Sequence, residues 1–322
     1  MIVSTRARAP ANLALVKYWG KRDAGCRLPA TSSLSVTLAA LGSEAEVRPS
    51  GEDRLDVQGD PSRAMRVIEA ARALSGCRDP LHVAVRNTVP TAAGLASSAS
   101  SMAALAFALA RALGLDDRPD DVALLARLGS GSAVRSLHGG FVRWDAGSAP
   151  DGSDCRARTA FPAAHLPLAV RIAVASDSPK SVSSTDAMER CRLTSPAYPG
   201  FLADNPAALQ EALSALEARD LERLGQVAES QSLGLHDVLH AAQPPIDLLL
   251  PASHTAIEVV RRLRDRGVPC FFSIDAGSSV AAFAEPAHAE AVGLALAAIP
   301  GVLRVLEDTV GEAGAVRVEE GA

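Results

Sequence analysis

The chain has 322 residues, 48% of them hydrophobic and 21% charged, with a formal net charge of −5. This composition predicts a folded chain with a sizeable core, and it gives no reason to expect nucleic acid as a partner. Charges interrupt every apolar stretch before it could span a membrane, and the first ten residues lack the apolar region of a secretion signal. We therefore expect a cytoplasmic protein without a membrane partner.

The first half of the chain combines strand and helix patterns. Alternation or a short apolar run marks four strands, over 34–38, 81–85, 139–144 and 168–175. Helical spacing marks three helices, over 62–74, 95–113 and 120–128. A segment rich in Gly, Ser, Pro and Asp predicts a loop over 147–154.

The second half is predicted to be mostly helical. Its helices are expected over 201–218, 220–239 and 253–266. Two short strands, 270–274 and 280–284, are expected to pair around Asp275. The length and this change of character predict an α+β protein of two domains, over residues 1–178 and 179–322.

Lysine is rare in this chain. Of 32 basic residues only three are lysines, Lys17, Lys21 and Lys180. Chance is one explanation, but a compact ammonium serves in places where a planar guanidinium does not. Because the three lysines stand in two short and unusual segments, we interpret them as functional.

The first of these segments is ANLALVKYWGKRD, residues 11–23. It gathers three cations, one of the two tyrosines and one of the two tryptophans. Cations and a phenol that follow a strand can form a phosphate-binding surface. Taken alone, a basic turn beside core aromatics explains the segment equally well.

A glycine turn leads through four serines into a helix in PTAAGLASSASS, residues 90–101. The free N–H groups and the positive end of such a helix form an anion site, and the hydroxyls can hold phosphate oxygens or Mg²⁺. The segment lacks the lysine of a GxxxxGK[ST] loop. An ordinary capped helix is the alternative, but four serines exceed what one cap requires.

Two further segments combine small residues with a cation. In RLGSGSAVRSLHGG, residues 127–140, a Gly-Ser loop precedes Arg135, whose guanidinium suits bidentate capture of a carboxylate. Residues 176–186 carry Lys180 within a serine cluster. Taken alone, the first is better explained as a flexible loop, and the second can be a hydroxyl-rich interdomain linker.

Asp275 directly follows an apolar strand and precedes Ala-Gly. An acid there is either a turn former or a buried base that faces a cationic site. His236 and His240 lie four residues apart on a predicted helix without the HExxH pattern, so we expect a surface or half-buried pair. The five scattered cysteines form no CxxC pair, which predicts structural thiols in place of a zinc site.

Together and in this order, these segments resemble the diphosphomevalonate decarboxylase family of the GHMP kinase superfamily, from Ala9 to about Val280. The resemblance is carried by ANLALVKYWGKRD, LSVTL, PTAAGLASSAS, RLGSGSAVRSLHGGFV, KSVSST and IDAG. It implies a two-domain GHMP kinase-like fold with the active site in the interdomain cleft, and a homodimer. It also implies a reaction of ATP, with Mg²⁺, and mevalonate 5-diphosphate that yields isopentenyl diphosphate, ADP, phosphate and carbon dioxide.

The resemblance and the chemistry assign roles to individual residues. Asp275 is expected to be the base for the tertiary 3-hydroxyl, and Arg135 is expected to hold the carboxylate. Lys17 is expected either to pair with Asp275 or to stabilise the charge that is transferred. The substrate is expected to contact Tyr18, Lys21, Ser130, Gly131, Ser132, Arg135 and Ser184. The nucleotide is expected to contact Gly94, Ala96, Ser97, Ser98 and Ser100, with Ser98 also at the metal ion.

Two positions depart from the family pattern. Ser278-Ser279 stands where the family often has Pro-Asn, and Thr31 where it often has asparagine. These departures leave open a decarboxylase for mevalonate 5-monophosphate. A mevalonate-type kinase that releases no carbon dioxide and a non-catalytic metabolite-binding relative are further alternatives, but the joint presence of Asp275, Lys17 and Arg135 argues against both.

Overall fold

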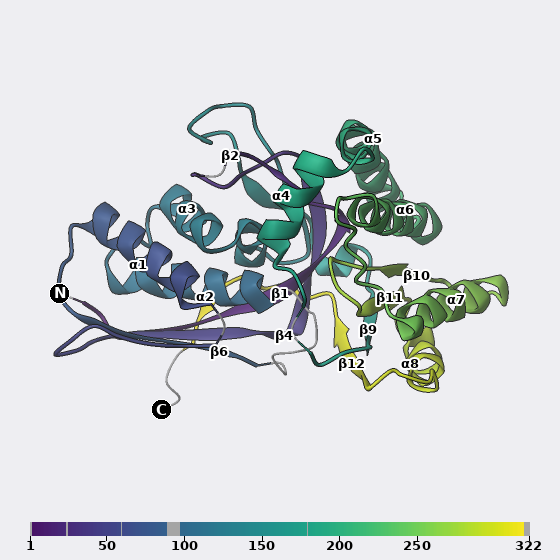
Figure 1. Cartoon of the computed structure of the whole chain (residues 1–322). Coiled ribbons are helices and arrows are strands. Elements are labelled where there is room, and N and C mark those ends of the chain that lie inside the picture. Colours follow the sequence, from purple (N-terminus) through teal and green to yellow (C-terminus); the bar gives the residue numbers. More distant parts are fainter. Residues whose placement is uncertain (1, 24, 59, 89–96, 179, 319–322) are drawn as a thin grey trace.

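Figure 1 shows the chain as two neighbouring units, each built from a sheet with helices packed against it. It is a computed structural model, and it describes residues 2–23, 25–58, 60–88, 97–178 and 180–318. Within these residues no helix combines the length and the apolar character needed to cross a membrane.

The first unit is built on a seven-stranded sheet. Its central path runs β13-β1-β4-β6-β5, and β7 and β8 extend it from β4. The strands are β1 (Thr5–Val16), β4 (Ser33–Pro49), β5 (Arg54–Val57), β6 (Leu81–Asn87), β7 (Phe141–Trp144), β8 (Ala157–Phe161) and β13 (Val316–Arg317). Because β4 is 17 residues long, one half of it pairs with β6 and the other with β7.

Three helices cover one face of this sheet, α1 (Pro61–Ser75), α2 (Ser97–Ala112) and α3 (Pro119–Gly129) (Figure 1). The small alanine side chains of α2, such as Ala103 and Ala106, are fully buried and allow the helix to lie close to the sheet. A 3-10 helix, η1 (Gly131–Leu137), follows α3 directly. A two-stranded sheet, β2 (Lys21–Asp23) with β3 (Leu28–Pro29), follows β1.

The second unit contains an antiparallel sheet in the order β10-β11-β9-β12. Its strands are β9 (Ala169–Val174), β10 (Cys270–Ser273), β11 (Val280–Ala284) and β12 (Arg304–Thr309). Neighbouring residues of β10 face opposite sides, so Phe271 joins the core shared with β1, while Phe272 joins the core under two outer helices. These outer helices are α7 (Pro251–Asp265) and α8 (Ala289–Ala297).

The two units share an apolar core. Helices α5 (Tyr198–Glu217) and α6 (Leu221–His240) contribute to it together with β1, β4, β9 and β11. Asp308 of β12 adds a polar connection, because its carboxylate accepts backbone N–H groups of residues 39–41, where β4 bulges away from β1. The ends of β1 and β10 therefore lie at a fixed junction.

The predicted α+β class and the predicted strands and helices are confirmed in their described parts, with most ends shifted by a few residues. The strand predicted over 34–38 is much longer than expected, because β4 continues to Pro49. The predicted interdomain linker, however, contains the start of a helix, α4 (Ser184–Thr194), whose N-cap is Ser183. The predicted flexible loop after α3 is the ordered helix η1. The division between residues 178 and 179 stays a prediction, although β9, which precedes it, pairs within the second sheet.

Candidate active site

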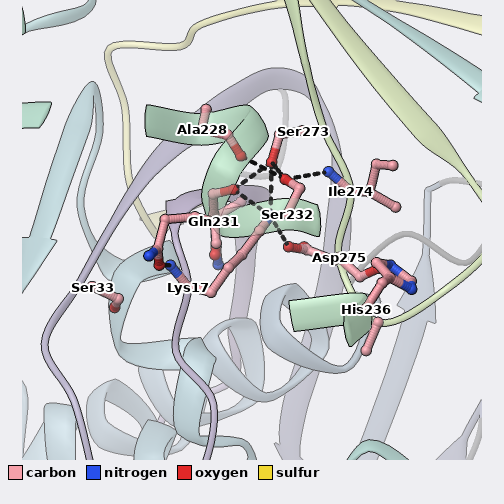
Figure 2. Close-up of polar contacts among 12 residues, drawn as sticks. Lys17, Ser33, Ala228, Gln231, Ser232, His236, Ser273, Ile274 and Asp275 are labelled. Carbon is pink, nitrogen blue, oxygen red and sulfur yellow. Dashed lines mark hydrogen bonds and ion pairs between the residues drawn. The ribbon is translucent and has the colours of Figure 1, made fainter. Parts of the chain in front are cut away.

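Lys17 comes directly after β1 and is 1% exposed. Its ammonium donates to Ala14 O at 2.7 Å, Ser273 Oγ at 2.7 Å and Asp275 Oδ1 at 3.0 Å (Figure 2). These bonds use all three of its N–H groups. Burial lowers the pKa of Lys17, and the Asp275 carboxylate opposes that shift.

Asp275 follows β10 and its side chain is 30% exposed. Lys17 holds Oδ1, whereas Oδ2 has no hydrogen-bond partner among the described residues. The backbone carbonyl of Asp275 accepts the N–H of Gly277 at 2.7 Å. One carboxylate oxygen is thus anchored, and the other is available to accept a proton.

Arg135 lies on η1 and is 3% exposed. Its Nε and Nη2 donate to Asn12 Oδ1 at 3.1 and 2.9 Å, and its Nη1 donates to Ser33 Oγ at 2.8 Å. No carboxylate of the described part forms an ion pair with it. Burial lowers its pKa to about 10, and Asp275 counteracts this shift, so the guanidinium keeps its charge at neutral pH.

Asn12 is a site residue that the sequence interpretation missed. Besides accepting two N–H groups of Arg135, it donates through Nδ2 to Ser132 O at 3.3 Å and to Ser136 Oγ at 2.7 Å. It therefore ties β1 to both ends of η1. A signal was present, because Asn12 is the one polar side chain in the apolar run ANLALV.

Tyr18 is 9% exposed and packs against Trp144, with ring centroids 4.9 Å apart. Its hydroxyl is buried and has no hydrogen-bond partner in the described part of the chain. Burial raises the pKa of this hydroxyl, so it stays neutral. A Cβ on Gly131 would collide with Tyr18 Oη. An unsatisfied buried hydroxyl beside a side-chain-free residue fits a bound ligand oxygen.

Lys21 stands in a group of cations. Burial and the positive charges of Arg27, Arg63 and Arg66 together lower its pKa to about 8, although the negative charge of Glu189 acts to raise it. Arg27 adopts a left-handed backbone conformation, with φ of 53°. Like charges gathered in this way are unfavourable until an anion binds among them.

The predicted serine ligands divide into two groups. Ser130 is 7% exposed and its Oγ lies 3.5 Å from Ser132 Oγ, and Gly131, between these two serines, adjoins Tyr18. Ser184 begins α4, and no hydrogen bond joins it to another predicted site residue within the described ranges. The structure thus brings Ser130, Gly131 and Ser132 together with Tyr18, and leaves the role of Ser184 a prediction.

The predicted nucleotide site is at the start of α2. Gly94 and Ala96 lie outside the described residues. The helix begins at Ser97 and its first turn carries no acidic side chain, which suits an anion at its positive end. Ser98 is half-buried, whereas Ser100 is 1% exposed and its Oγ lies 2.7 Å from Ser43 Oγ. Nucleotide and metal contacts of these serines stay predictions.

Two further residues border Asp275. The ammonium of Lys180 donates to Ala276 O; that end of an otherwise exposed side chain is desolvated, which lowers its pKa. The rarity of lysine had indicated a functional role for this residue. His236 is buried and bonds to the backbone of Asp275, so the expectation of a surface or half-buried pair was wrong for His236, whereas His240 is exposed.

The two-sheet architecture and the Lys17–Asp275 pair at the junction define a two-domain protein of the GHMP kinase type. The model of the diphosphomevalonate decarboxylase-like N-terminal domain matches residues 9–157, and that of the mevalonate 5-diphosphate decarboxylase C-terminal domain matches residues 170–311. The chain therefore belongs to the diphosphomevalonate decarboxylase family, as the sequence motifs predicted.

Individual relatives agree with this conclusion. The chain is 37% identical to the diphosphomevalonate decarboxylase of Bos taurus, over 88% of this chain and 77% of that protein. It is 35% identical to that of Gibberella zeae, over 91% and 84%. The mevalonate diphosphate decarboxylase structure from Staphylococcus aureus superposes with a TM-score of 0.92 at 32% identity, covering 99% of each chain. A complex named MDDEF with MVAPP, AMPPCP and magnesium superposes at 0.90, with 36% identity over 99% of this chain and 100% of that one.

Proposed function

We propose that the protein decarboxylates mevalonate 5-diphosphate to isopentenyl diphosphate in an ATP-dependent reaction that requires Mg²⁺. The observation that carries this proposal is the buried guanidinium of Arg135, which has only neutral partners within the described residues. A buried charge is costly unless it is paired, and the substrate carboxylate supplies the missing partner. The similar complex with MVAPP, AMPPCP and magnesium supports the same ligands here.

Asp275 acts as the base in this proposal. Its free Oδ2 accepts the proton of the tertiary 3-hydroxyl while the hydroxyl oxygen attacks the γ-phosphorus, and ADP leaves with the electron pair of the bond between that phosphorus and the bridging oxygen. Lys17 orients the carboxylate through its hydrogen bond to Oδ1. Because its three N–H groups are already used, Lys17 supports Asp275 and does not bind the transferring phosphoryl group directly.

Arg135 serves the second step. Phosphate leaves with the electron pair of the C–O bond, and positive character develops at C3. The electrons of the bond that joins the carboxylate to C2 then form a C2–C3 double bond, and the carboxylate is released as carbon dioxide. Three of the five N–H groups of Arg135 are used by Asn12 and Ser33, which leaves two for the carboxylate. The fixed guanidinium aligns the bond that breaks.

The remaining predicted residues bind the phosphates. The cations around Lys21, with Tyr18, Ser130, Ser132 and Ser184, face the 5-diphosphate in this proposal, and several cations suit a diphosphate better than a monophosphate. Gly94, Ala96, Ser97, Ser98 and Ser100 bind ATP. Ser98 and phosphate oxygens hold Mg²⁺, which neutralises phosphate charge.

The test measures ADP and carbon dioxide from mevalonate, its 5-phosphate and its 5-diphosphate, with wild type and Asp275→Asn. We expect both products from the diphosphate alone, and a loss of turnover on the order of 10²–10⁴-fold in the variant with nucleotide affinity unchanged. Asp247→Asn, at an exposed acid that pairs with His240, is the matched control. ADP without carbon dioxide would identify a kinase, and near-normal Asp275→Asn would refute the base.

We also propose a homodimer, which the family resemblance supports. Sedimentation equilibrium over a range of concentrations tests this assignment. A single species of monomer mass at micromolar concentration would contradict it.

A further inference from the structure

Strand β10 lies at one edge of the second sheet, with β11 on its only paired side among the described strands. The outward N–H groups of an edge strand need other partners. Helix α6 provides them with side chains: Glu229 Oε1 accepts the N–H of Phe272 at 3.2 Å, and Ser232 Oγ accepts that of Ile274 at 3.0 Å. Glu229 and Ser232 are 8% and 0% exposed, so this contact is protected from water.

The same face of α6 continues to Asp275. His236 Nε2 lies 3.2 Å from the backbone carbonyl of Asp275, and because a carbonyl only accepts, Nε2 carries the hydrogen. Glu229, Ser232 and His236 are spaced three and four residues apart, which places them on one side of a helix. Figure 2 shows Ser232 and His236 directed toward the segment that ends in Asp275.

Helix α6 also holds the other member of the ion pair. Gln231 Oε1 accepts the backbone N–H of Lys17 at 3.2 Å, and Gln231 is 6% exposed. Lys17 follows strand β1 of the first sheet, whereas Asp275 follows strand β10 of the second sheet. One helix thus fixes both backbones whose side chains meet at 3.0 Å.

We propose that His236 is a positioning residue of the reaction, which holds the Asp275 backbone so that the carboxylate meets both Lys17 and the substrate hydroxyl. This inference rests on the role of Asp275 proposed above. His236 acts through Asp275, because its donor nitrogen, Nε2, is hydrogen-bonded to the Asp275 carbonyl.

The charge state of His236 agrees with this role. Burial and the facing charges of Lys17 and Lys180 together lower its pKa to about 4, although the carbonyl and carboxylate of Asp275 act to raise it. The imidazole is therefore neutral throughout the range from pH 6 to 9, and the pH profile of the enzyme contains no step from it.

The experiment compares His236→Gln with His236→Met in the full-length protein. Glutamine can place an amide N–H near the position of Nε2, whereas methionine fills similar space without a donor. For His236→Met we expect kcat to fall roughly 3- to 10-fold, the effect of one lost hydrogen bond, with both KM values nearly unchanged. His236→Gln should recover most of kcat, and both pH profiles should match wild type.

Val238→Ala on the same helix is the matched control, because Val238 is 1% exposed and belongs to the apolar core. It should lower the melting temperature and leave kcat per folded molecule unchanged. Wild-type kcat in His236→Met would overturn the inference, as would failure of His236→Gln to recover kcat or a shifted pH profile. Asp275→Asn is measured alongside. Full activity of that variant would instead refute the assignment of Asp275 as the base, on which the inference rests.

Discussion

Replacement of Arg135 by lysine distinguishes a carboxylate-binding arginine from one that only ties down η1. The variant keeps the positive charge but removes the planar fork. In the structure that fork already donates three N–H groups to Asn12 and Ser33. A lysine has three N–H groups in total, so the substrate carboxylate would compete with Asn12 and Ser33 for them.

The expected loss follows from this count. At least one charge-assisted hydrogen bond to the carboxylate is lost, which costs about 1.5–3 kcal/mol. At 1.36 kcal/mol per factor of ten, this corresponds to about a 10- to 150-fold lower kcat/KM. Carbon dioxide and ADP release should fall together, because the same contact places the hydroxyl beside Asp275 and aligns the breaking bond.

The assay follows carbon dioxide, ADP and melting temperature in the same preparation. Arg127→Lys is the matched control, because Arg127 is also buried, at 4% exposed, and its Nε donates to the backbone carbonyl of Cys26 at 2.8 Å. The control should lose thermal stability and keep its turnover. Full activity of Arg135→Lys with a depressed melting temperature would refute the carboxylate role.

Three further predictions concern the phosphate-binding parts of the site. Ser98→Ala should raise the KM for Mg-ATP more than that for mevalonate diphosphate. If only the KM for mevalonate diphosphate rose, the start of α2 would be the substrate site and not the nucleotide site. Because the pKa of Lys21 is lowered to about 8, its ammonium loses its proton as the pH rises through 8. The affinity of the wild type for mevalonate diphosphate should therefore weaken from pH 7 to 9, whereas that of Lys21→Arg should stay level. Titration calorimetry at the two pH values measures this, and parallel slopes would contradict it. Gly131→Ala should raise the KM for mevalonate diphosphate, because the new Cβ displaces Tyr18. Gly200→Ala is the control and should leave this KM unchanged, since a Cβ there meets nothing within 4 Å. Equal KM values in the two variants would exclude a role of Gly131 in substrate binding.

The local elements and the chemical types of the site residues could be predicted from the sequence. Periodicity and caps act over a few neighbouring residues, so helices such as α1, with its Asp60 cap and left-handed Gly76, were predictable. The rarity of lysine pointed to Lys17 and Lys180, because a chain that uses arginine almost everywhere keeps a lysine where a compact ammonium is needed. Asp275 was predictable as an acid at the end of an apolar strand.

Which site side chains contact one another could be seen only in the tertiary structure. Lys17 and Asp275 are 258 positions apart, and Arg135 and Asn12 are 123 apart, so no local pattern records either contact. The same holds for His236. The helical pattern predicts a surface residue, but in the structure α6 packs on β10 and His236 contacts the backbone of Asp275. Such contacts depend on how two sheets and α6 pack around a shared apolar core, and this packing is a property of the whole chain.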